Sequence, residues 1–394
     1  MNDARITKIR KLEERIRELV DTRENKRRAE IWSDHRGATD YIWHPLPKTK
    51  EKMPYSFEIE RIGYAQMLNF SLVKFYTDPI EFVMRQLEMN VFKFETFSED
   101  CTPIAKSITY WPGVGYEMSL MGQPQYYSEE DAWIGRDPVI KERVPLAEIE
   151  YPDFFENPIM KETDVFYNKM REVLSDDFTL LYPQWCRSPW SIAFAIRGYE
   201  NLVYDYAEDP EWLLGFVNLI AEYRVRWSEQ RAKYLGTPLV PTNFYNDEVM
   251  APTISRDMYR DMILPSEKRI SEAFGGINYW HSCGDTTPFL QEINSIPNVA
   301  MVQVSPWTNV QEAVKVYDKT KVLEIAIHPL ADVMMPDYPE RIDEKIREIK
   351  AATTEFKSVC RADGFMVMNG DIEGSIKKLQ HWIDRANEIL LGGR

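Results

Sequence analysis

The strongest constraint on the fold is a regular alternation of short β-type runs and helix-length segments after residue 160. The β-type runs cover residues 178–185, 240–246, 277–283, 301–305, 322–327 and 365–368, and an earlier run at 91–97 fits the same series. The segments between them cover 188–235 (two helices), 253–274, 308–318 and 338–361. This alternation predicts βαβ units around a parallel sheet. Because the chain lacks the G-x-G-x-x-G turn of an open doubly wound sheet, we predict an α/β fold of the TIM-type (β/α)8 barrel class, with its eighth strand near the N-terminus.

The N-terminal part predicts a separate helical arm. Residues 4–32 carry apolar side chains at the three-to-four spacing of an amphipathic helix, and residues 44–54 are rich in Pro and Lys, as in a loop. We therefore expect residues 1–60 to form an arm and loop, and residues 61–394 to form the barrel. Residues 106–160 predict an irregular strand-and-loop insertion with a hairpin. We expect the arm to pack on its own chain, with a homodimer contact as the alternative.

Charge and composition exclude several classes of protein. A net charge of −15 argues against a general nucleic-acid or anionic-membrane surface. The apolar runs are too short for a membrane span, and residues 1–19 are charged throughout, unlike a signal peptide, so we expect a cytoplasmic protein. Four scattered cysteines are too few for a disulfide scaffold.

The run at 277–285 ends in His281-Ser282-Cys283-Gly284. Residues two apart on a strand point the same way, so His281 and Cys283 would lie side by side at a strand end. An imidazole nitrogen and a thiolate are half of a zinc site. The alternative is a buried thiol beside a hydrogen-bonded histidine.

Carboxylates and a second histidine follow other expected strand ends. Asp247 and Glu248 come after the run at 240–246, and either could complete a metal shell or bind a ligand group; we expect Glu248 as a metal ligand and Asp247 as a catalytic group. The alternative is that both are helix-cap or loop residues. His328 closes the run at 322–327 and could be a general acid or base, or simply a loop histidine.

Aromatic residues gather at the same strand ends. They could fill the core or wall a pocket for a flat or hydrophobic ligand. Arg187 could hold an anionic group of the ligand. The expected substrate-binding residues are Trp185, Arg187, Tyr245, Asn246, Trp280 and Trp307.

The remaining cysteines and histidines are weaker candidates. We place Cys360 on the helix before the last strand, away from the barrel mouth, and Cys186 directly after an expected strand. His35 and His44 fall in the N-terminal loop region and His381 on the last helix, so all three are expected to be peripheral.

Several segments in this order resemble the uroporphyrinogen decarboxylase superfamily, and within it the corrinoid-dependent methyltransferase branch. They are Arg197-Gly198-Tyr199-Glu200, Glu208-Asp209-Pro210-Glu211, Asn246-Asp247, residues 254–259, Leu264-Pro265, His281-Ser282-Cys283-Gly284, residues 326–329 and Ala362-Asp363-Gly364. The resemblance extends from about residue 160 to the C-terminus. It implies a TIM-type barrel whose zinc is held by a His-x-Cys strand end and a further cysteine near the last strand. His281 and Cys283 match the first part, but no cysteine stands near 369–371.

The resemblance implies a methyltransferase that moves a methyl group from a small O- or N-methyl compound, such as an aryl methyl ether, to a corrinoid protein with the help of zinc. Two alternatives stay open. One is a metal-independent decarboxylase of a uroporphyrinogen-like or smaller carboxylate, in which Asp247 stabilises positive charge and His328 is the acid. The other is a non-catalytic binder of a corrinoid or tetrapyrrole. The Arg-Gln-Ala-Gly-Arg-Tyr segment typical of the decarboxylase branch has no counterpart here.

Overall fold

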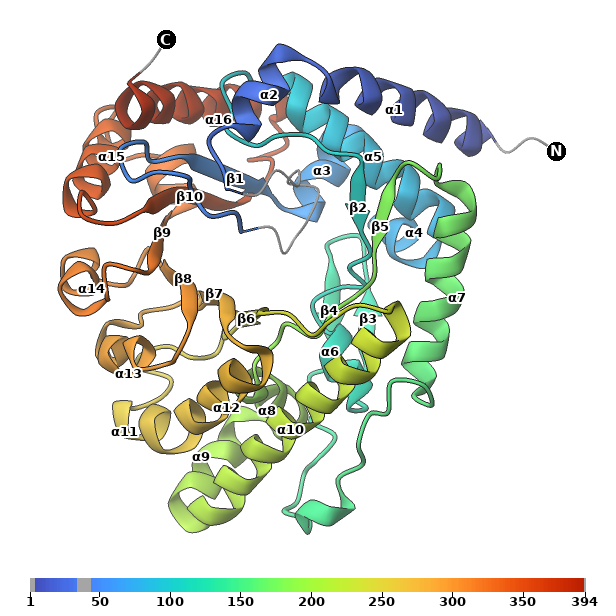
Figure 1. The fold of residues 1–394 in the computed structure, drawn as a ribbon, viewed down its shortest axis with the longest axis vertical. Coiled ribbons are helices and arrows are strands. Elements are labelled where there is room, and N and C mark those ends of the chain that lie inside the picture. The colour runs from blue at the N-terminus through green and yellow to red at the C-terminus, as the bar shows by residue number, and fades with distance from the viewer. Residues whose placement is uncertain (1–3, 34–43, 393–394) are drawn as a thin grey trace.

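A computed structural model describes residues 4–33 and 44–392, and its centre is a curled parallel sheet (Figure 1). Six strands follow the order β1-β10-β9-β8-β7-β6, and a second parallel sheet pairs β2 with β5. The strands are β1 (Tyr55–Ile59), β2 (Ser107–Thr109), β5 (Thr179–Leu181), β6 (Thr242–Tyr245), β7 (Ile277–His281), β8 (Val299–Val304), β9 (Val322–Ile327) and β10 (Ser358–Phe365). With helices outside the curl, this is the predicted α/β barrel architecture.

The two sheets are joined by residues 186–188, which follow β5 and pair with the end of β6. Arg187 forms a parallel bridge with Tyr245, the Tyr245 N–H donates to the Cys186 carbonyl, and the Ser188 N–H donates to the Tyr245 carbonyl. The predicted hairpin in the insertion is β3 (Gln125–Tyr127) with β4 (Ala132–Ile134), an antiparallel pair outside the barrel strands.

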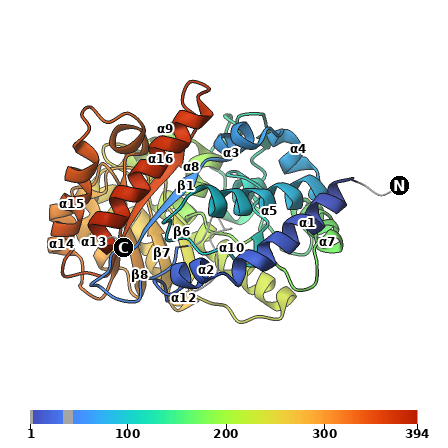
Figure 2. The same ribbon diagram turned by 90° about the horizontal axis from the view of Figure 1, so that it is seen from above.

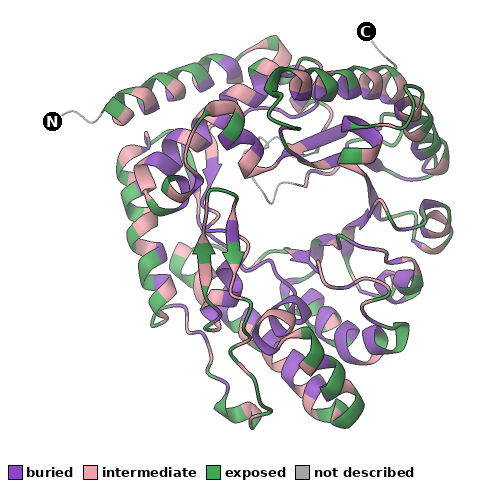
Figure 3. Ribbon diagram, turned by 180° about the vertical axis from the view of Figure 1, so that it is seen from behind, coloured by how far each residue is buried: buried purple, intermediate pink, exposed green. Residues whose placement is uncertain are grey.

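Helices surround the strands and turn their polar faces outward; Figure 3 shows buried strands and exposed outer helix faces. The α-helices are α1 (Ala4–Val20), α2 (Arg23–Ala29), α3 (Arg61–Leu68), α4 (Leu72–Thr77), α5 (Pro79–Thr96), α6 (Tyr116–Leu120), α7 (Pro158–Val173), α8 (Pro189–Arg197), α9 (Tyr199–Glu208), α10 (Pro210–Leu235), α11 (Arg256–Met258), α12 (Leu264–Phe274), α13 (Leu290–Asn294), α14 (Val310–Val316), α15 (Arg341–Ala352) and α16 (Ile372–Ala386). Short 3-10 turns η1 (Leu146–Glu148) and η3 (Thr287–Phe289) and π-helical turns η2 (Tyr259–Ile263), η4 (Leu330–Met334) and η5 (Asn387–Leu391) join them.

Four of the longer helices begin with the same local signal, a capping side chain followed by proline. Asp78, Asn157, Ser188 and Asp209 accept hydrogen bonds from the first-turn N–H groups of α5, α7, α8 and α10. Each cap satisfies an N–H that has no partner within the helix, and the proline that follows needs none. These starts are fixed by local sequence.

Three sequence-based assignments were wrong. Residues 91–97 belong to helix α5 and to its C-terminal turn, because their apolar side chains extend the apolar face of an 18-residue helix. The expected helix at 338–361 ends at Ala352, and the last strand is β10, ahead of 365–368. Residues 188–235 form three helices in place of two. In the structure, the barrel sheet begins with β1 at Tyr55.

The N-terminal arm packs on its own chain. Helix α1 lies along α5 and buries Ile9, Ile16 and Leu19 (Figure 2). Ion pairs from Arg5 to Asp78 and from Lys8 to Glu88 border this contact. The arm is therefore a part of the helical layer around the barrel.

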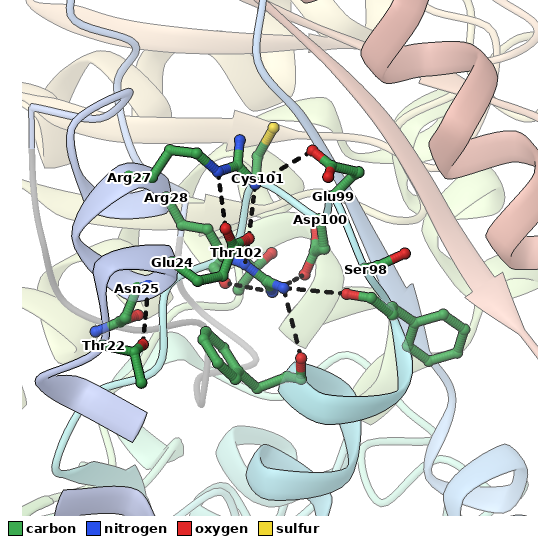
Figure 4. A network of polar contacts seen from close by, with 12 residues as sticks. Thr22, Glu24, Asn25, Arg27, Arg28, Ser98, Glu99, Asp100, Cys101 and Thr102 are labelled. Carbon is green, nitrogen blue, oxygen red and sulfur yellow. Dashed lines mark hydrogen bonds and ion pairs between the residues drawn. The ribbon is translucent and has the colours of Figure 1, made fainter. Parts of the chain in front are cut away.

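Helix α2 is anchored by a buried arginine (Figure 4). The Arg28 guanidinium donates to the carbonyls of Thr102 and Phe97 at 3.3 and 3.1 Å, and lies 3.6 Å from the Asp100 carboxylate. It also stands 4.2 Å from the centre of the Phe94 ring. Asp100 is completely buried, so its charge depends on Arg28 for compensation.

In the part of the chain that the structure describes, no helix has both the length and the apolar character needed to cross a membrane.

Replacing Arg28 by Met should lower the free energy of unfolding by about 3–5 kcal/mol, because it leaves the Asp100 carboxylate buried without its partner. Urea unfolding followed by circular dichroism measures the change. Arg269→Met is the control, since Arg269 is half-exposed and its ion pair with Glu222 lies in solvent. Equal stability of the Arg28 variant and this control would contradict the assignment.

Candidate active site

Three different ligand-type side chains meet at the carboxyl ends of β6 and β7. His281 is the last residue of β7, Cys283 follows two residues later, and Asp247 stands two residues beyond β6. The His281 Nε2 lies 3.0 Å from Asp247 Oδ1 and 3.2 Å from Cys283 Sγ, and the Sγ lies 3.4 Å from the same Oδ1. These three form a group in which all ligand atoms lie within 4.8 Å of one another.

The loops that follow β6 and β7 contact each other next to this group. The Asn246 N–H donates to the His281 carbonyl, and Ser282 Oγ donates to the Val249 carbonyl at 2.7 Å. A Cβ added at Gly284 would clash with Met250, so glycine is needed for this close approach. The positions of Asp247 and Cys283 are thus set by backbone contacts between the two loops.

The group fits a zinc ion by its donor chemistry. Imidazole nitrogen, thiolate sulfur and carboxylate oxygen are the three common zinc donors. In a tetrahedral site with bonds of about 2.0–2.3 Å, ligand atoms lie roughly 3.3–3.8 Å apart, close to the separations here. Three protein ligands leave a fourth position for a reacting molecule, which is the pattern of catalytic zinc.

Arg187 holds the carboxylate of the group in place. Its guanidinium forms an ion pair with Asp247 Oδ2, which leaves Oδ1 directed at His281 and Cys283. Burial opposes ionisation of Asp247, but the charge of Arg187 outweighs burial and holds the pKa of Asp247 well below its usual value. Burial, with the Asp247 charge, raises the pKa of the Cys283 thiol. A bound cation would favour the thiolate and would release its proton.

Behind His281, a tyrosine and a glutamate continue the site into the barrel. The Tyr279 hydroxyl lies 3.3 Å from His281 Nδ1 and donates to Glu324 Oε1 at 2.5 Å. Burial raises the pKa of Tyr279 well above its usual value, so the hydroxyl stays a donor. This contact fixes the imidazole orientation, as outer partners of metal-binding histidines commonly do.

His44 lies in the barrel interior beside Tyr279 and Glu324. This position corrects the expectation that His44 is peripheral. Its ring stacks on Tyr279 with centroids 3.4 Å apart, Nδ1 lies 3.2 Å from Glu324 Oε2, and Nε2 lies 2.9 Å from the Tyr245 hydroxyl. Burial lowers the pKa of His44 to about 4. The neutral ring therefore donates from Nδ1 to Glu324 and accepts from Tyr245 at Nε2.

Glu324 is balanced by an arginine on the neighbouring strand. Arg361 Nε lies 3.8 Å from Glu324 and also pairs with Asp363 and Glu58. Burial opposes ionisation of Glu324, but the charge of Arg361 outweighs it and holds the pKa of Glu324 at about 2. The barrel interior is thus a connected charged network next to the Asp247–His281–Cys283 group.

Two expected substrate-binding residues point to the opposite side of the sheet. Trp280 alternates with Tyr279 and His281 along β7, and its Nε1 donates to Glu267 on α12 at 3.1 Å. Asn246 Nδ2 donates to the same glutamate at 2.7 Å. Burial raises the pKa of Glu267 to about 7. Both residues therefore serve the contact between the sheet and α12, on the side of the sheet opposite the Asp247–His281–Cys283 group.

Glu248 and Trp185 are also directed away from the group. Glu248 Oε2 accepts a hydrogen bond from Ser191 near the start of α8, so Asp247 takes the place expected for Glu248. Trp185 is buried edge-on against Trp227 of α10, with ring centroids 5.9 Å apart, and belongs to the core. Arg187 and Tyr245, by contrast, are brought to the site.

His328 and Trp307 form a separate pair at the rim of the barrel. Their rings lie 5.5 Å apart, the His328 Nδ1 accepts from the Ala331 N–H, and Trp307 is 58% exposed. His328 does follow β9 as expected, but it is not one of the clustered ligand-type residues.

The remaining predictions have mixed outcomes. Cys360 lies on β10 and not on a helix, and burial raises the pKa of its thiol to about 12. His381 is exposed on α16, as expected. His35 lies outside the described residues.

Sequence reasoning missed Tyr279, Glu324, Arg361 and His44. Tyr279 could have been found, because it stands two residues before His281 on the same strand face. Glu324 also carries a signal, a lone carboxylate in the apolar run at 322–327. His44 carries none, since only the folded arm brings it to the barrel.

Residues 134–359 match the uroporphyrinogen decarboxylase (URO-D) family. The chain belongs to this family. A methylated-thiol–coenzyme M methyltransferase of Methanosarcina mazei is 27% identical over 107 residues, a stretch that covers 27% of this chain and 28% of that protein. A methyltransferase structure from Methanosarcina mazei superposes with a TM-score of 0.60 at 10% identity, covering 85% of this chain and 94% of the other, which shows a shared fold. The predicted family resemblance and barrel fold are thereby confirmed.

The apo protein should bind about one zinc per chain, and Cys283→Ala should weaken binding by at least about 100-fold, more than loss of an outer partner costs. Competition with a chromophoric chelator gives the affinities. Cys186→Ala is the control, because Cys186 is outside the ligand group. Tyr279→Phe should weaken binding about 10-fold or more. Unchanged affinity in Cys283→Ala would refute the assignment.

His44 should make the fold sensitive to acid. Its folded-state pKa of about 4 lies below the ordinary value of 6.5, so the unfolded chain takes up the proton first. The stability that neutral His44 contributes is full above about pH 6.5 and is lost as the pH falls towards 4, by about 3 kcal/mol. Urea unfolding at several pH values should show a smaller acid loss for His44→Gln. Parallel curves for the two proteins would contradict this.

Proposed function

We propose that this chain is a methyltransferase that moves a methyl group from a small O-, N- or S-methyl donor to a corrinoid protein. The observation that carries the proposal is the convergence of His281 Nε2, Cys283 Sγ and Asp247 Oδ1 within 3.0–3.4 Å of one another at the carboxyl ends of barrel strands. The methyltransferase relatives support it, since their fold and part of their sequence are similar to those of this chain.

His281, Cys283 and Asp247 would hold the zinc. When bound there, the ion supplies Lewis-acid chemistry towards the heteroatom that carries the methyl group. Arg187 keeps Asp247 ionised and fixes its second oxygen, so that one oxygen remains available as a ligand. Tyr279 and Glu324 orient the imidazole from behind.

In the transfer itself, the bond between the methyl carbon and its heteroatom breaks, and the heteroatom keeps the electron pair. The methyl carbon bonds to cobalt(I) of the corrinoid protein, which is the acceptor substrate. The acceptor must reach the carboxyl face of the barrel. Trp307, Leu330 and Met366, which follow β8, β9 and β10, are exposed and offer it apolar surface.

The charged interior keeps the ligand group in one arrangement. Glu324 is compensated by Arg361 and accepts from Tyr279 and His44, so the groups behind His281 are already bonded before any substrate binds. A site ordered in advance loses less free energy in positioning the reacting atoms. This is the role we assign to the network.

Zinc-loaded protein should form methylcob(III)alamin from cob(I)alamin and a methyl donor, read from the visible spectrum of the cobalamin. His281→Ala and Asp247→Ala should lower the rate by at least about 100-fold, since each removes a donor to the metal. His328→Ala tests the expected acid–base role and should change the rate far less, because it lies outside the group. A rate of methylcobalamin formation that is independent of zinc would contradict the role given to the metal, and carbon dioxide release from a carboxylate substrate without methylcobalamin formation would favour the decarboxylase.

A further inference from the structure

A large cavity lies under the hairpin insertion, and none of its lining residues belongs to the Asp247–His281–Cys283 group. Its volume is about 1100 Å³, which is enough for a drug-sized ligand. It is bounded by α6, by the start of the hairpin, by the segment 139–152 and by α7. All of these elements except α7 belong to the insertion that interrupts the barrel between β2 and β5.

The walls of this cavity are aromatic. Tyr110 and Phe166 stack with centroids 4.9 Å apart, and Tyr76 and Tyr127 stack with centroids 5.0 Å apart. Tyr116 also lines it. Ring faces with a negative quadrupole attract organic cations, and groups of such rings recognise quaternary ammonium ions.

The charged side chains of the lining are mostly acidic. Four glutamates, at 142, 148, 150 and 162, line the cavity with a single base, Lys141. Among the described residues, none of the four glutamates has an ion-pair partner. This balance repels an anionic ligand and favours a cationic one.

One largely buried tyrosine of the lining keeps an accessible hydroxyl. Tyr110 is only 7% exposed, and its hydroxyl makes no hydrogen bond with any described residue. Burial raises the pKa of Tyr110 well above its usual value, and the charges of Tyr127, Tyr116 and Glu162, which act in the same direction, belong to the same cavity lining. An accessible hydroxyl in a cavity wall is available to donate to, or accept from, a ligand atom.

The lining of this cavity is shared in part with a second cavity that reaches residues of the candidate active site. A much smaller cavity shares Tyr110, Pro112 and Tyr116 with it and is otherwise lined by Arg187 and Tyr245, among others. Arg187 is the ion-pair partner of Asp247. The small cavity therefore lies between the aromatic cavity and the arginine that pairs with Asp247.

We propose that this aromatic, acidic cavity binds an organic ammonium ion with N-methyl groups. The rings of Tyr110, Tyr127 and Phe166 contact the methylated nitrogen, Glu162 supplies negative charge, and the remaining volume holds the rest of the ligand. Binding by this cavity does not depend on the proposed methyl transfer. If both proposals hold, methylammonium compounds are the first donors to test.

Choline and its uncharged isostere 3,3-dimethyl-1-butanol are the probes, compared by titration calorimetry with the full chain at low salt. Choline should bind at least about 10-fold more tightly than the isostere, because only the cation gains from the rings and the carboxylates. Phe166→Leu should weaken choline binding several-fold, and Glu162→Gln should do so while leaving the isostere unchanged. Glu172→Gln is the matched control on α7, since it lies outside the cavity lining.

Added salt should weaken choline binding and leave binding of the isostere unchanged. Cys283→Ala should bind choline as the wild type does, which separates this site from the ligand group. Equal affinities for choline and the isostere, absence of choline binding, or loss of binding only in Cys283→Ala would each overturn the proposal. None of these results would bear on zinc binding or methyl transfer.

Discussion

The site depends on the parallel pairing of β6 with β7. Tyr245 stands opposite His281 in this register, and the Asn246 N–H donates to the His281 carbonyl just beyond the strand end. Asp247 is consequently held beside the imidazole although the two residues are 34 positions apart. A shift of one residue would exchange the inward and outward faces of β7, placing Trp280 inside the barrel and His281 against α12.

The second requirement is compensation of buried charge. Asp247 depends on Arg187, and Glu324 depends on Arg361; removing either arginine would leave a carboxylate buried without a partner. The uncharged side chains of Tyr279 and His44 donate hydrogen bonds to the two carboxylate oxygens of Glu324. Tyr279 also lies against His281, so it links Glu324 to the Asp247–His281–Cys283 group. Such a network restricts the imidazole of His281 to one orientation, which a reactive site requires and a purely apolar interior would not provide.

Much of the barrel and the centre of the site could be predicted from the sequence. His281 and Cys283 were predicted as neighbours because the period-2 rule acts within a single strand, and Asp247 was predicted near them, as a catalytic group, because it follows another strand end. The sequence-based predictions fail where a side chain next to a strand end can point either towards the barrel interior or towards the surrounding helices. Trp280 and Glu248 are adjacent to residues of the ligand group, but their side chains contact α12 and α8. The run at 91–97 could not be distinguished from helix by its apolar content alone.

Local sequence by itself determined the helix starts, the alternation of strands and helices, and the residue types at the strand ends, because capping and periodicity act over a few neighbouring residues. Only the tertiary structure decided which of these residues meet. His44 reaches Glu324 across 280 positions, and Arg187 reaches Asp247 across 60. The insertion lines an aromatic cavity together with residues of α4 and α7. Contacts of this kind depend on how the whole sheet curls, which no short stretch of sequence encodes.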